Sequence, residues 1–255
     1  MVMKLDKRKD KILEILKKNG TVRVTNLSKT LNVSEVTVRN YLTDMENKGL
    51  LTRVHGGAIF SYRPYYSMNL NQRLETNRQV KERIAKKAAN LVKPNDTVML
   101  NAGTTTLLAF RYLPYDYNLN IVTNSISIAL EGSGNPNYNI VLIGGTINSK
   151  FQFTYGEDAI EILKKYHADK LILSVDGVDM KNGFSTYYAE ETQVDKAMIE
   201  QSDSCIIVAD NSKFDKNAFS KVYDLNVADY IVTDKDFNTE DSKLMAKHGI
   251  KIIET

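Results

Sequence analysis

The spacing of apolar residues over the first 60 positions predicts three short helices. The first lies among lysines and ends near Asn19-Gly20. Its apolar stripe consists of Ile12, Leu13, Ile15 and Leu16. A second apolar segment follows, with Thr25 as its expected N-cap, and Asn32-Val33 forms a tight turn. Ser34 is the expected N-cap of the third helix, because its hydroxyl can accept hydrogen bonds from the first turn.

The third predicted helix, residues 34–46, has a buried face and a polar face. Val38, Leu42 and Met45 are spaced i, i+4 and i+7 and form the buried face. The polar residues near its start are Ser34, Glu35, Thr37, Arg39 and Asn40. Because the start of a recognition helix reaches base edges in the major groove, we predict that these five residues contact DNA.

Residues 50–60 alternate around the paired glycines Gly56-Gly57, which predicts a small β-hairpin. A hairpin directly after a helix-turn-helix forms a wing. Arg53 and His55 lie on this predicted wing, where we expect them to approach phosphates or the minor groove.

Beyond the wing, short continuous apolar strands alternate with helices, which predicts a mostly parallel, Rossmann-like α/β sheet covered on both faces. Pro64 breaks any helix between the two parts. We therefore expect three regions: a winged helix-turn-helix head at 1–60, a connector at 61–78 and an α/β effector-binding domain at 79–255.

Charge divides the chain in the same way. Residues 1–60 carry 12 Lys and Arg against 6 Asp and Glu, whereas residues 61–255 carry 22 against 25. A basic head on a mildly acidic body is typical of a polyanion-binding module joined to a part that binds no polyanion. The hydrophobic fraction of 42% over 255 residues allows a sizeable core and excludes a disordered chain.

The single cysteine, Cys205, excludes an intrachain disulfide, and its apolar neighbours are typical of a small core residue. No apolar run approaches the roughly 18 residues that a membrane span needs. We therefore expect a soluble protein of a reducing compartment, with no membrane partner.

Four polar motifs each follow a predicted strand, at residues 101–106, 123–125, 176–177 and 210–213. Because ligands bind outside the carboxyl ends of parallel strands, we expect these motifs to converge on one cleft. The candidate ligand-binding residues are Asn101, Gly103, Thr104, Thr105, Thr106, Asn124, Ser125, Asp176, Gly177 and Lys213.

The first of these motifs favours a phosphate ligand. Gly103 permits a close backbone approach, and the three threonines after it begin a predicted helix whose free N–H groups and dipole attract an anion. No Gly-Lys-Ser/Thr follows, so this is not a nucleoside triphosphate loop. Lys213 can neutralise a second side of an anionic ligand, and Asp176 can accept hydrogen bonds from sugar hydroxyls.

The head resembles a known family. The strings Val33-Ser34-x-x-Thr37-Val38-Arg39 and Gly49-Leu50-Leu51-x-Arg53-Val54-His55-Gly56-Gly57-Ala58 resemble the N-terminal signature of the DeoR family of bacterial transcription regulators. The family usually has Arg-Arg-Asp where this chain has Arg39-Asn40-Tyr41. Base preference is therefore expected to differ, since Asn binds adenine whereas Arg favours guanine or phosphate.

The body resembles the sensor domain of the same family, which is similar in fold to ribose phosphate isomerase. Asn101-Ala102-Gly103-Thr104-Thr105 stands where the family usually has Asp-Ser-Gly-Thr-Thr. The family's Asp-Gly pair and its Ser-Ser-Lys-Phe segment correspond to Asp176-Gly177 and to Asn211-Ser212-Lys213-Phe214. The loss of a carboxylate and a hydroxyl at residues 101 and 102 indicates a shifted choice of effector.

The resemblance covers nearly the whole chain and implies a cytoplasmic bacterial regulator, most simply a repressor of a carbohydrate operon. It implies operator DNA and a phosphorylated sugar or sugar derivative as partners. A helix-turn-helix usually acts as a dimer on paired half-sites, so a homodimer or higher homo-oligomer is expected. No catalytic residue, metal or cofactor is expected.

The alternative is a sugar-phosphate isomerase with an accessory head. Asp176, Asp179, Glu190 and Glu191 offer the acid and base that proton transfer between sugar carbons needs. The sequence lacks a Lys-Gly-Gly-rich loop, and a basic winged head has no use in such an enzyme. The residues therefore favour the regulator.

Overall fold

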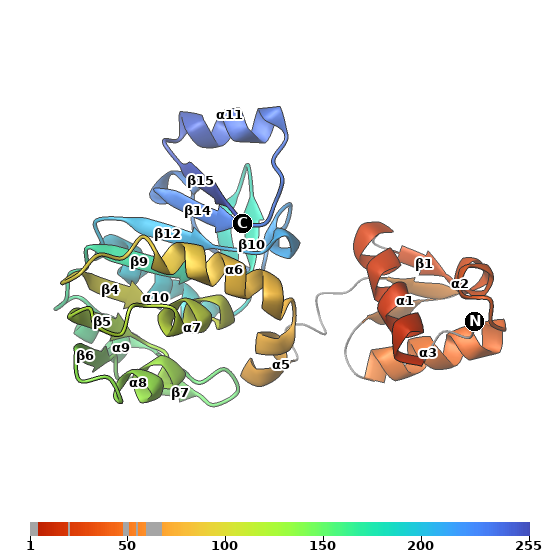
Figure 1. Ribbon diagram of the computed structural model, residues 1–255, viewed down its shortest axis with the longest axis horizontal. Helices are drawn as coiled ribbons and strands as arrows, with labels where there is room; N and C mark the ends of the chain where they lie inside the picture. Colours follow the sequence, from red (N-terminus) through yellow and green to blue (C-terminus); the bar gives the residue numbers. More distant parts are fainter. Residues whose placement is uncertain (1–4, 20, 48–50, 55, 60–67) are drawn as a thin grey trace. The chain divides into compact units, whose positions relative to one another are not determined.

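The computed structural model describes residues 5–19, 21–47, 51–54, 56–59 and 68–255 (Figure 1). The chain divides into two compact units, Met1–Arg73 and Leu74–Thr255. The division falls inside the region 61–78 that the sequence assigns to a connector. Each unit has a hydrophobic core of its own.

The first unit is a winged helix-turn-helix. Its elements are α1 (Leu5–Asn19), β1 (Thr21–Arg23), α2 (Val24–Leu31), α3 (Glu35–Asn47), β2 (Thr52–Val54) and β3 (Gly57–Ile59). The strands form an antiparallel sheet in the order β1-β3-β2. The predicted helices and hairpin are confirmed, and Val38, Leu42 and Met45 are buried as expected.

Two local features of this unit differ from the sequence prediction. The strand β1 was not expected, because three residues with only Val22 buried are too short for a clear alternating pattern. The N-cap assigned to Thr25 is wrong. Helix α2 begins at Val24 after an extended Arg23 that makes no side-chain cap, so Thr25 lies inside the first turn.

The second unit is built on a seven-stranded sheet in the order β15-β14-β12-β9-β4-β5-β6. All neighbouring pairs in this sheet are parallel, which confirms the predicted α/β class. The strands are β4 (Thr97–Leu100), β5 (Leu119–Thr123), β6 (Tyr138–Leu142), β9 (Lys170–Ser174), β12 (Cys205–Val208), β14 (Tyr230–Thr233) and β15 (Lys251–Glu254).

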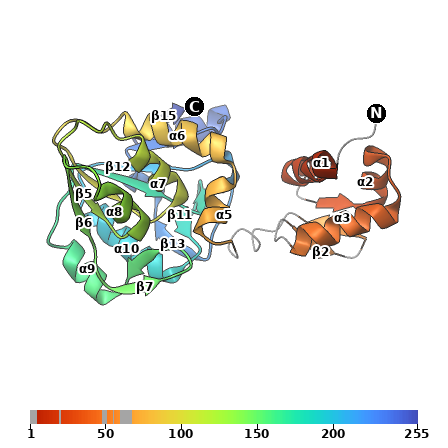
Figure 2. The same cartoon turned by 60° about the horizontal axis from the view of Figure 1, so that its bottom comes forward.

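Helices cover both faces of this sheet, and each face has a separate hydrophobic core (Figures 1 and 2). One core includes residues of α6 (Arg78–Ala89), α7 (Thr104–Arg111) and α8 (Ile126–Gly132). The other includes residues of α9 (Glu157–Leu163), α10 (Ala189–Glu200) and α11 (Thr239–Lys247). The short helix α5 (Leu70–Glu75) crosses the division between the units.

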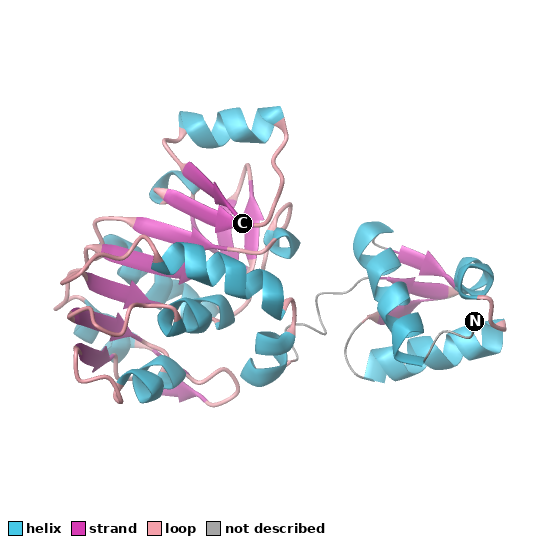
Figure 3. Cartoon of the chain, viewed as in Figure 1, coloured by secondary structure: helices cyan, strands magenta, loops and turns pink. Residues whose placement is uncertain are grey.

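Smaller elements extend the loops of this sheet (Figure 3). An antiparallel sheet has the order β10-β11-β13, and β7 pairs with β8 as a hairpin. These additions are β7 (Thr146–Asn148), β8 (Phe153–Tyr155), β10 (Gly177–Asp179), β11 (Gly183–Thr186), β13 (Ser220–Tyr223) and the single-turn helices η1 (Asn211–Lys213) and η2 (Leu225–Val227). These small elements were not predicted from the sequence.

The strand order identifies where a ligand is expected. The chain runs from β4 through β5 to β6 in one direction, then returns to β9 and continues through β12 and β14 to β15 in the other. The order therefore reverses between β4 and β9, and ligands of open α/β sheets bind at such a point, outside the carboxyl ends of the strands.

Candidate functional site

The start of α3 is held by its own side chains. The Thr37 N–H donates to Ser34 Oγ at 3.1 Å, and the two hydroxyl oxygens lie 2.9 Å apart. The prediction that Ser34 is the N-cap is therefore confirmed. The two hydroxyls bond to each other at the helix start, where the predicted contacts to DNA also lie.

The next residues of α3 are exposed. Glu35 and Arg39 form an ion pair of 3.2 Å across one turn, and Asn40 is exposed beside them. Val36, which is not among the predicted DNA contacts, is 67% exposed. An exposed apolar residue at this place suits a thymine methyl group. The sequence could have indicated Val36 by its position, because Val36 lies outside the helix face that Val38, Leu42 and Met45 form.

The strand β2 is tied to α3. The Arg53 backbone N–H donates to Glu46 Oε1 at 2.7 Å, and its guanidinium donates to Thr43 Oγ1 at 2.8 Å. These bonds place Arg53 next to α3, the helix that carries Arg39. The Arg53 side chain is exposed. His55, the other predicted wing contact, lies outside the described residues.

In the second unit, the structure brings the four predicted polar motifs to one edge of the sheet. They follow β5, β4, β9 and β12, which are consecutive neighbours. Thr123 Oγ1 donates to the carbonyl of Leu100 at 2.7 Å, and the Ser174 N–H donates to Asn101 Oδ1 at 3.0 Å. These bonds link the ends of β5, β4 and β9.

Both the Nδ2 and the Oδ1 of the Asn101 side chain form hydrogen bonds within the protein. Its Nδ2 donates to the Ser174 carbonyl at 3.0 Å and to Asp195 Oδ1 at 3.1 Å. Its Oδ1 accepts from the N–H and the hydroxyl of Ser174. The amide therefore orders the ends of β4 and β9, and a direct contact with an effector would require it to give up one of these bonds.

Gly103 is also in close contact with β9. A Cβ at this position would lie 1.8 Å from Ser174 Oγ, so the close approach that Gly103 allows is to Ser174. Thr106 is engaged as well, because its hydroxyl accepts from the Gly103 N–H at 2.9 Å and lies 2.8 Å from the Asn101 carbonyl oxygen, to which it donates. Both residues shape the loop before α7.

The polar groups of Thr104 and Thr105, unlike those of Asn101 and Thr106, are not engaged by the neighbouring loops that the structure describes. Within the described residues, neither the hydroxyls nor the backbone N–H groups of Thr104 and Thr105 have a hydrogen-bond partner. These groups lie at the N-terminus of α7, where the helix dipole favours an anion. No partner within the described residues therefore competes with the phosphate predicted to bind Thr104 and Thr105.

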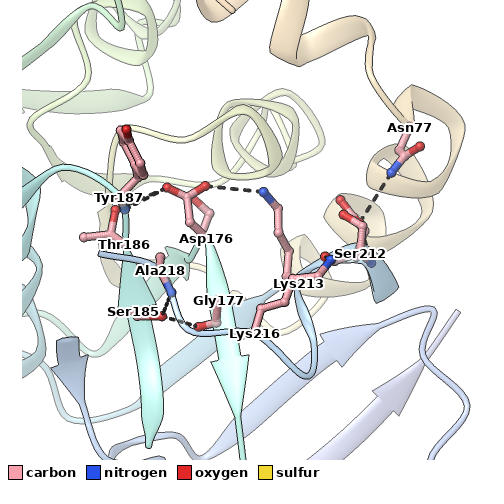
Figure 4. A network of polar contacts seen from close by, with 12 residues as sticks. Asn77, Asp176, Gly177, Ser185, Thr186, Tyr187, Ser212, Lys213, Lys216 and Ala218 are labelled. Carbon is pink, nitrogen blue, oxygen red and sulfur yellow. Dashed lines mark hydrogen bonds and ion pairs between the residues drawn. The ribbon is translucent and has the colours of Figure 1, made fainter. Parts of the chain in front are cut away.

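Asp176 and Lys213 form a buried ion pair from two neighbouring loops (Figure 4). Lys213 Nζ lies 3.3 Å from Asp176 Oδ1, and each side chain is 9% exposed. The Tyr187 N–H donates to the other carboxylate oxygen at 3.1 Å. Lys213 ends η1, so the pair joins the loop after β9 to the loop after β12.

Three other predicted residues have structural contacts. Ser125 is the N-cap of α8 and accepts from the Ile128 N–H at 3.3 Å. Asn124 is buried and donates to the carbonyl of Thr154 at 3.2 Å. A Cβ on Gly177 would lie 2.5 Å from Ser185 Oγ, so only glycine fits there.

Asp195 was not predicted from the sequence; it is buried on α10 and accepts a hydrogen bond from Asn101 Nδ2. Burial raises its pKa to about 7, and the nearby Asp176 charge adds to the increase, while the hydrogen bond from Asn101 opposes it. The available signal was the i, i+4 spacing of Glu191 and Asp195 beside the apolar Val194, which places two carboxyls on a buried helix face.

Burial also raises the pKa of Cys205, so this thiol stays protonated and acts as the small core residue that the sequence predicts. In the described part of the chain, no three metal-ligating side chains gather to form a cation site. None of the described helices is both long and apolar enough to cross a bilayer.

Comparison with known proteins agrees with this geometry. Residues 8–63 match the DeoR-like helix-turn-helix domain, and residues 76–235 match the DeoR C terminal sensor domain. The helix-turn-helix-type transcriptional regulator YulB of Bacillus subtilis (strain 168) is 33% identical, over 98% of this chain and 96% of its own length.

Two further relatives are named as repressors. The lactose phosphotransferase system repressor of Streptococcus mutans serotype c is 32% identical, over 91% of this chain and 93% of its own. The glycerol-3-phosphate regulon repressor of Escherichia coli (strain K12) is 29% identical, over 98% of this chain and 99% of its own. These matches favour the regulator over the isomerase.

Proposed function

Because the chain belongs to the DeoR family of DNA-binding transcription regulators, we propose that it represses an operon of carbohydrate metabolism and responds to a phosphorylated sugar or sugar derivative. The observation that carries this proposal is the N-terminus of α7, where Thr104 and Thr105 offer hydroxyl and N–H donors at the reversal of strand order.

In this proposal the phosphate binds the α7 N-terminus and draws Lys213 away from Asp176. The freed Asp176 carboxylate then accepts hydrogen bonds from the hydroxyls of the sugar. Lys213 and Asp176 lie within hydrogen-bond distance of each other and come from adjacent loops, so one ligand can contact both. Two named relatives, for glycerol 3-phosphate and for a lactose phosphotransferase system, support the class of ligand.

DNA binding involves the start of α3 and the wing, through Ser34, Glu35, Thr37, Arg39, Asn40, Arg53 and His55. Each chain supplies one helix-turn-helix, so we propose that two chains bind two half-sites as a homodimer or within a higher homo-oligomer. The site of action is the bacterial cytoplasm, where operator DNA and sugar phosphates occur together.

A thermal-shift series tests the effector proposal. The series contains inorganic phosphate, glycerol 3-phosphate, hexose 6-phosphates and the unphosphorylated parents. A ligand at about 100 times its Kd stabilises the folded state by roughly 2.7 kcal/mol, so we expect a clear increase in Tm with at least one phosphorylated compound. Equal stabilisation by a sugar and by its phosphate would contradict a phosphate site.

Arg39→Ala should weaken binding to operator DNA, because Arg39 is exposed at the base-facing start of α3. A contact with phosphate would reduce the slope of log Kd against log salt by about 1, whereas a base contact would make the loss depend on sequence. Fluorescence anisotropy measures both. Arg111→Ala is the control, since Arg111 is also paired with a glutamate but lies in the sensor unit. An unchanged isotherm for Arg39→Ala would remove it from the interface.

A further inference from the structure

Asn77 lies at a sharp bend at the beginning of the sensor unit. Helix α5 ends at Glu75 and α6 begins at Arg78, and Asn77 between them has the left-handed conformation, with φ 54°. The sensor unit begins at Leu74, so Asn77 belongs to the segment by which the DNA-binding unit continues into it. Asparagine adopts this conformation more readily than most residues.

The side chain of Asn77 reaches the loop after β12. Its Nδ2 donates to Asp210 Oδ1 at 3.4 Å, a long hydrogen bond between residues 133 positions apart (Figure 4). Asp210 is buried, and the same oxygen accepts from the Ser212 N–H at 2.9 Å. One carboxylate oxygen is therefore shared between the start of the sensor unit and η1.

Asp210 also determines where Lys213 lies. The Lys213 N–H donates to the Asp210 carbonyl at 2.9 Å, while the carboxylate caps the turn through Ser212. Lys216 holds the turn from its other side, because Nζ donates to the Ser212 carbonyl. A continuous series of polar contacts thus runs from Asn77 through Asp210 and Lys213 to Asp176.

We propose that Asn77 is a positioning residue that couples the Lys213 loop to the segment leading to the DNA-binding unit. This inference rests on the proposed function. When an anion draws Lys213 away from Asp176, η1 shifts, and the shared carboxylate of Asp210 carries the shift to Asn77 and the bend between α5 and α6. The effector and the operator then influence each other through this contact.

Asn77→Gly tests the coupling, because glycine keeps the left-handed bend while the amide is lost. The probes are inorganic phosphate and the tightest-binding compound of the thermal-shift series. Allosteric couplings are typically about 5–150-fold, and we expect the effector-induced change in operator Kd to shrink by about fivefold or more. Operator affinity without effector should stay within about twofold of wild type.

Asn90→Gly is the matched control, since Asn90 is exposed at the other end of α6 and has ordinary helical angles. It should retain the full effector response. An unchanged response in Asn77→Gly, with effector still bound, would overturn the coupling.

Hydrogen exchange gives a second test that needs no ligand. Asn77→Gly should speed exchange of the Ser212 and Lys213 N–H groups, which both donate to Asp210. Unchanged exchange at these two amides would overturn the positioning role. If no compound of the series binds wild type, the proposed effector fails while this exchange result still decides the role of Asn77.

Discussion

Lys213→Met should lower the free energy of unfolding by about 3–5 kcal/mol, because it removes the cation that pairs with the buried Asp176 carboxylate. Both side chains of this pair are only 9% exposed, so water screens little of the loss. The same substitution should remove the preference for phosphorylated ligands. Urea unfolding of the full chain measures the first effect, and calorimetry measures the second.

The two effects can be separated by changing both members of the pair. Asp176→Asn with Lys213→Met removes both charges, so most of the lost stability should return. Phosphate affinity should not return, because the double variant still lacks the cation. In a protein where the pair served stability alone, the double variant would bind the phosphorylated ligand as wild type does.

Lys221→Met is the control for the loss of a lysine. Lys221 pairs with Asp224 at 2.5 Å, but the two side chains are 54% and 69% exposed. Exposed pairs contribute about 0–1 kcal/mol, so neither stability nor ligand binding should change much. A loss for Lys213→Met no larger than for Lys221→Met would show that the Asp176–Lys213 pair is not the buried pair described above.

Local sequence signals predicted much of this molecule. Ser34 was identified as a cap because a hydroxyl before a helix acts on its own first turn, and that bond needs no distant partner. The strands of the main sheet were identified because they are buried on both faces and therefore continuously apolar. The meeting of the polar motifs at one edge followed from the rule for parallel sheets.

The features that were missed depend on partners distant in sequence. Asn101 was interpreted as a ligand contact because its loop follows a strand, but its amide bonds to Ser174 and Asp195, which come 73 and 94 positions later. Gly103 was predicted to allow a ligand to approach its backbone closely, and the structure adds that Ser174 Oγ lies where a Cβ of residue 103 would stand. No pattern within a single segment reveals such pairs.

Asn101→Asp, which installs the residue that the family usually has, should destabilise this chain strongly at neutral pH. An aspartate can keep the bond from the Ser174 N–H, but its second oxygen would face two acceptors, the Ser174 carbonyl and Asp195 Oδ1. The unsatisfied carbonyl alone costs about 1–3 kcal/mol. Two carboxyls this close cannot both ionise, so they must retain a proton.

The pH dependence of stability follows from the sign of this shift. Asp195 has a folded pKa of about 7, which is above its unfolded value. The contribution of Asp195 to stability is therefore fully present below the unfolded pKa and is lost as the pH rises toward 7. The second carboxyl in Asn101→Asp should make that loss larger and extend it to higher pH. Urea unfolding at pH 5 and pH 8 should therefore separate the variant from wild type more at pH 8.

Asp195→Asn supplies the matched comparison. With Asn101 intact, it should stabilise the chain at pH 8 relative to wild type and flatten the pH dependence, because no buried carboxyl remains to titrate at this position. Combined with Asn101→Asp, it should recover only part of the loss, since the Ser174 carbonyl still faces a carboxylate.

Equal losses for Asn101→Asp with and without Asp195→Asn would show that the two side chains do not interact. The expected result instead explains the departure from the family pattern at residue 101 by the buried carboxyl on α10. In that case Asn101 matches Asp195, and we expect the effector to be selected by Thr104 and Thr105 and by Lys213 once it leaves Asp176.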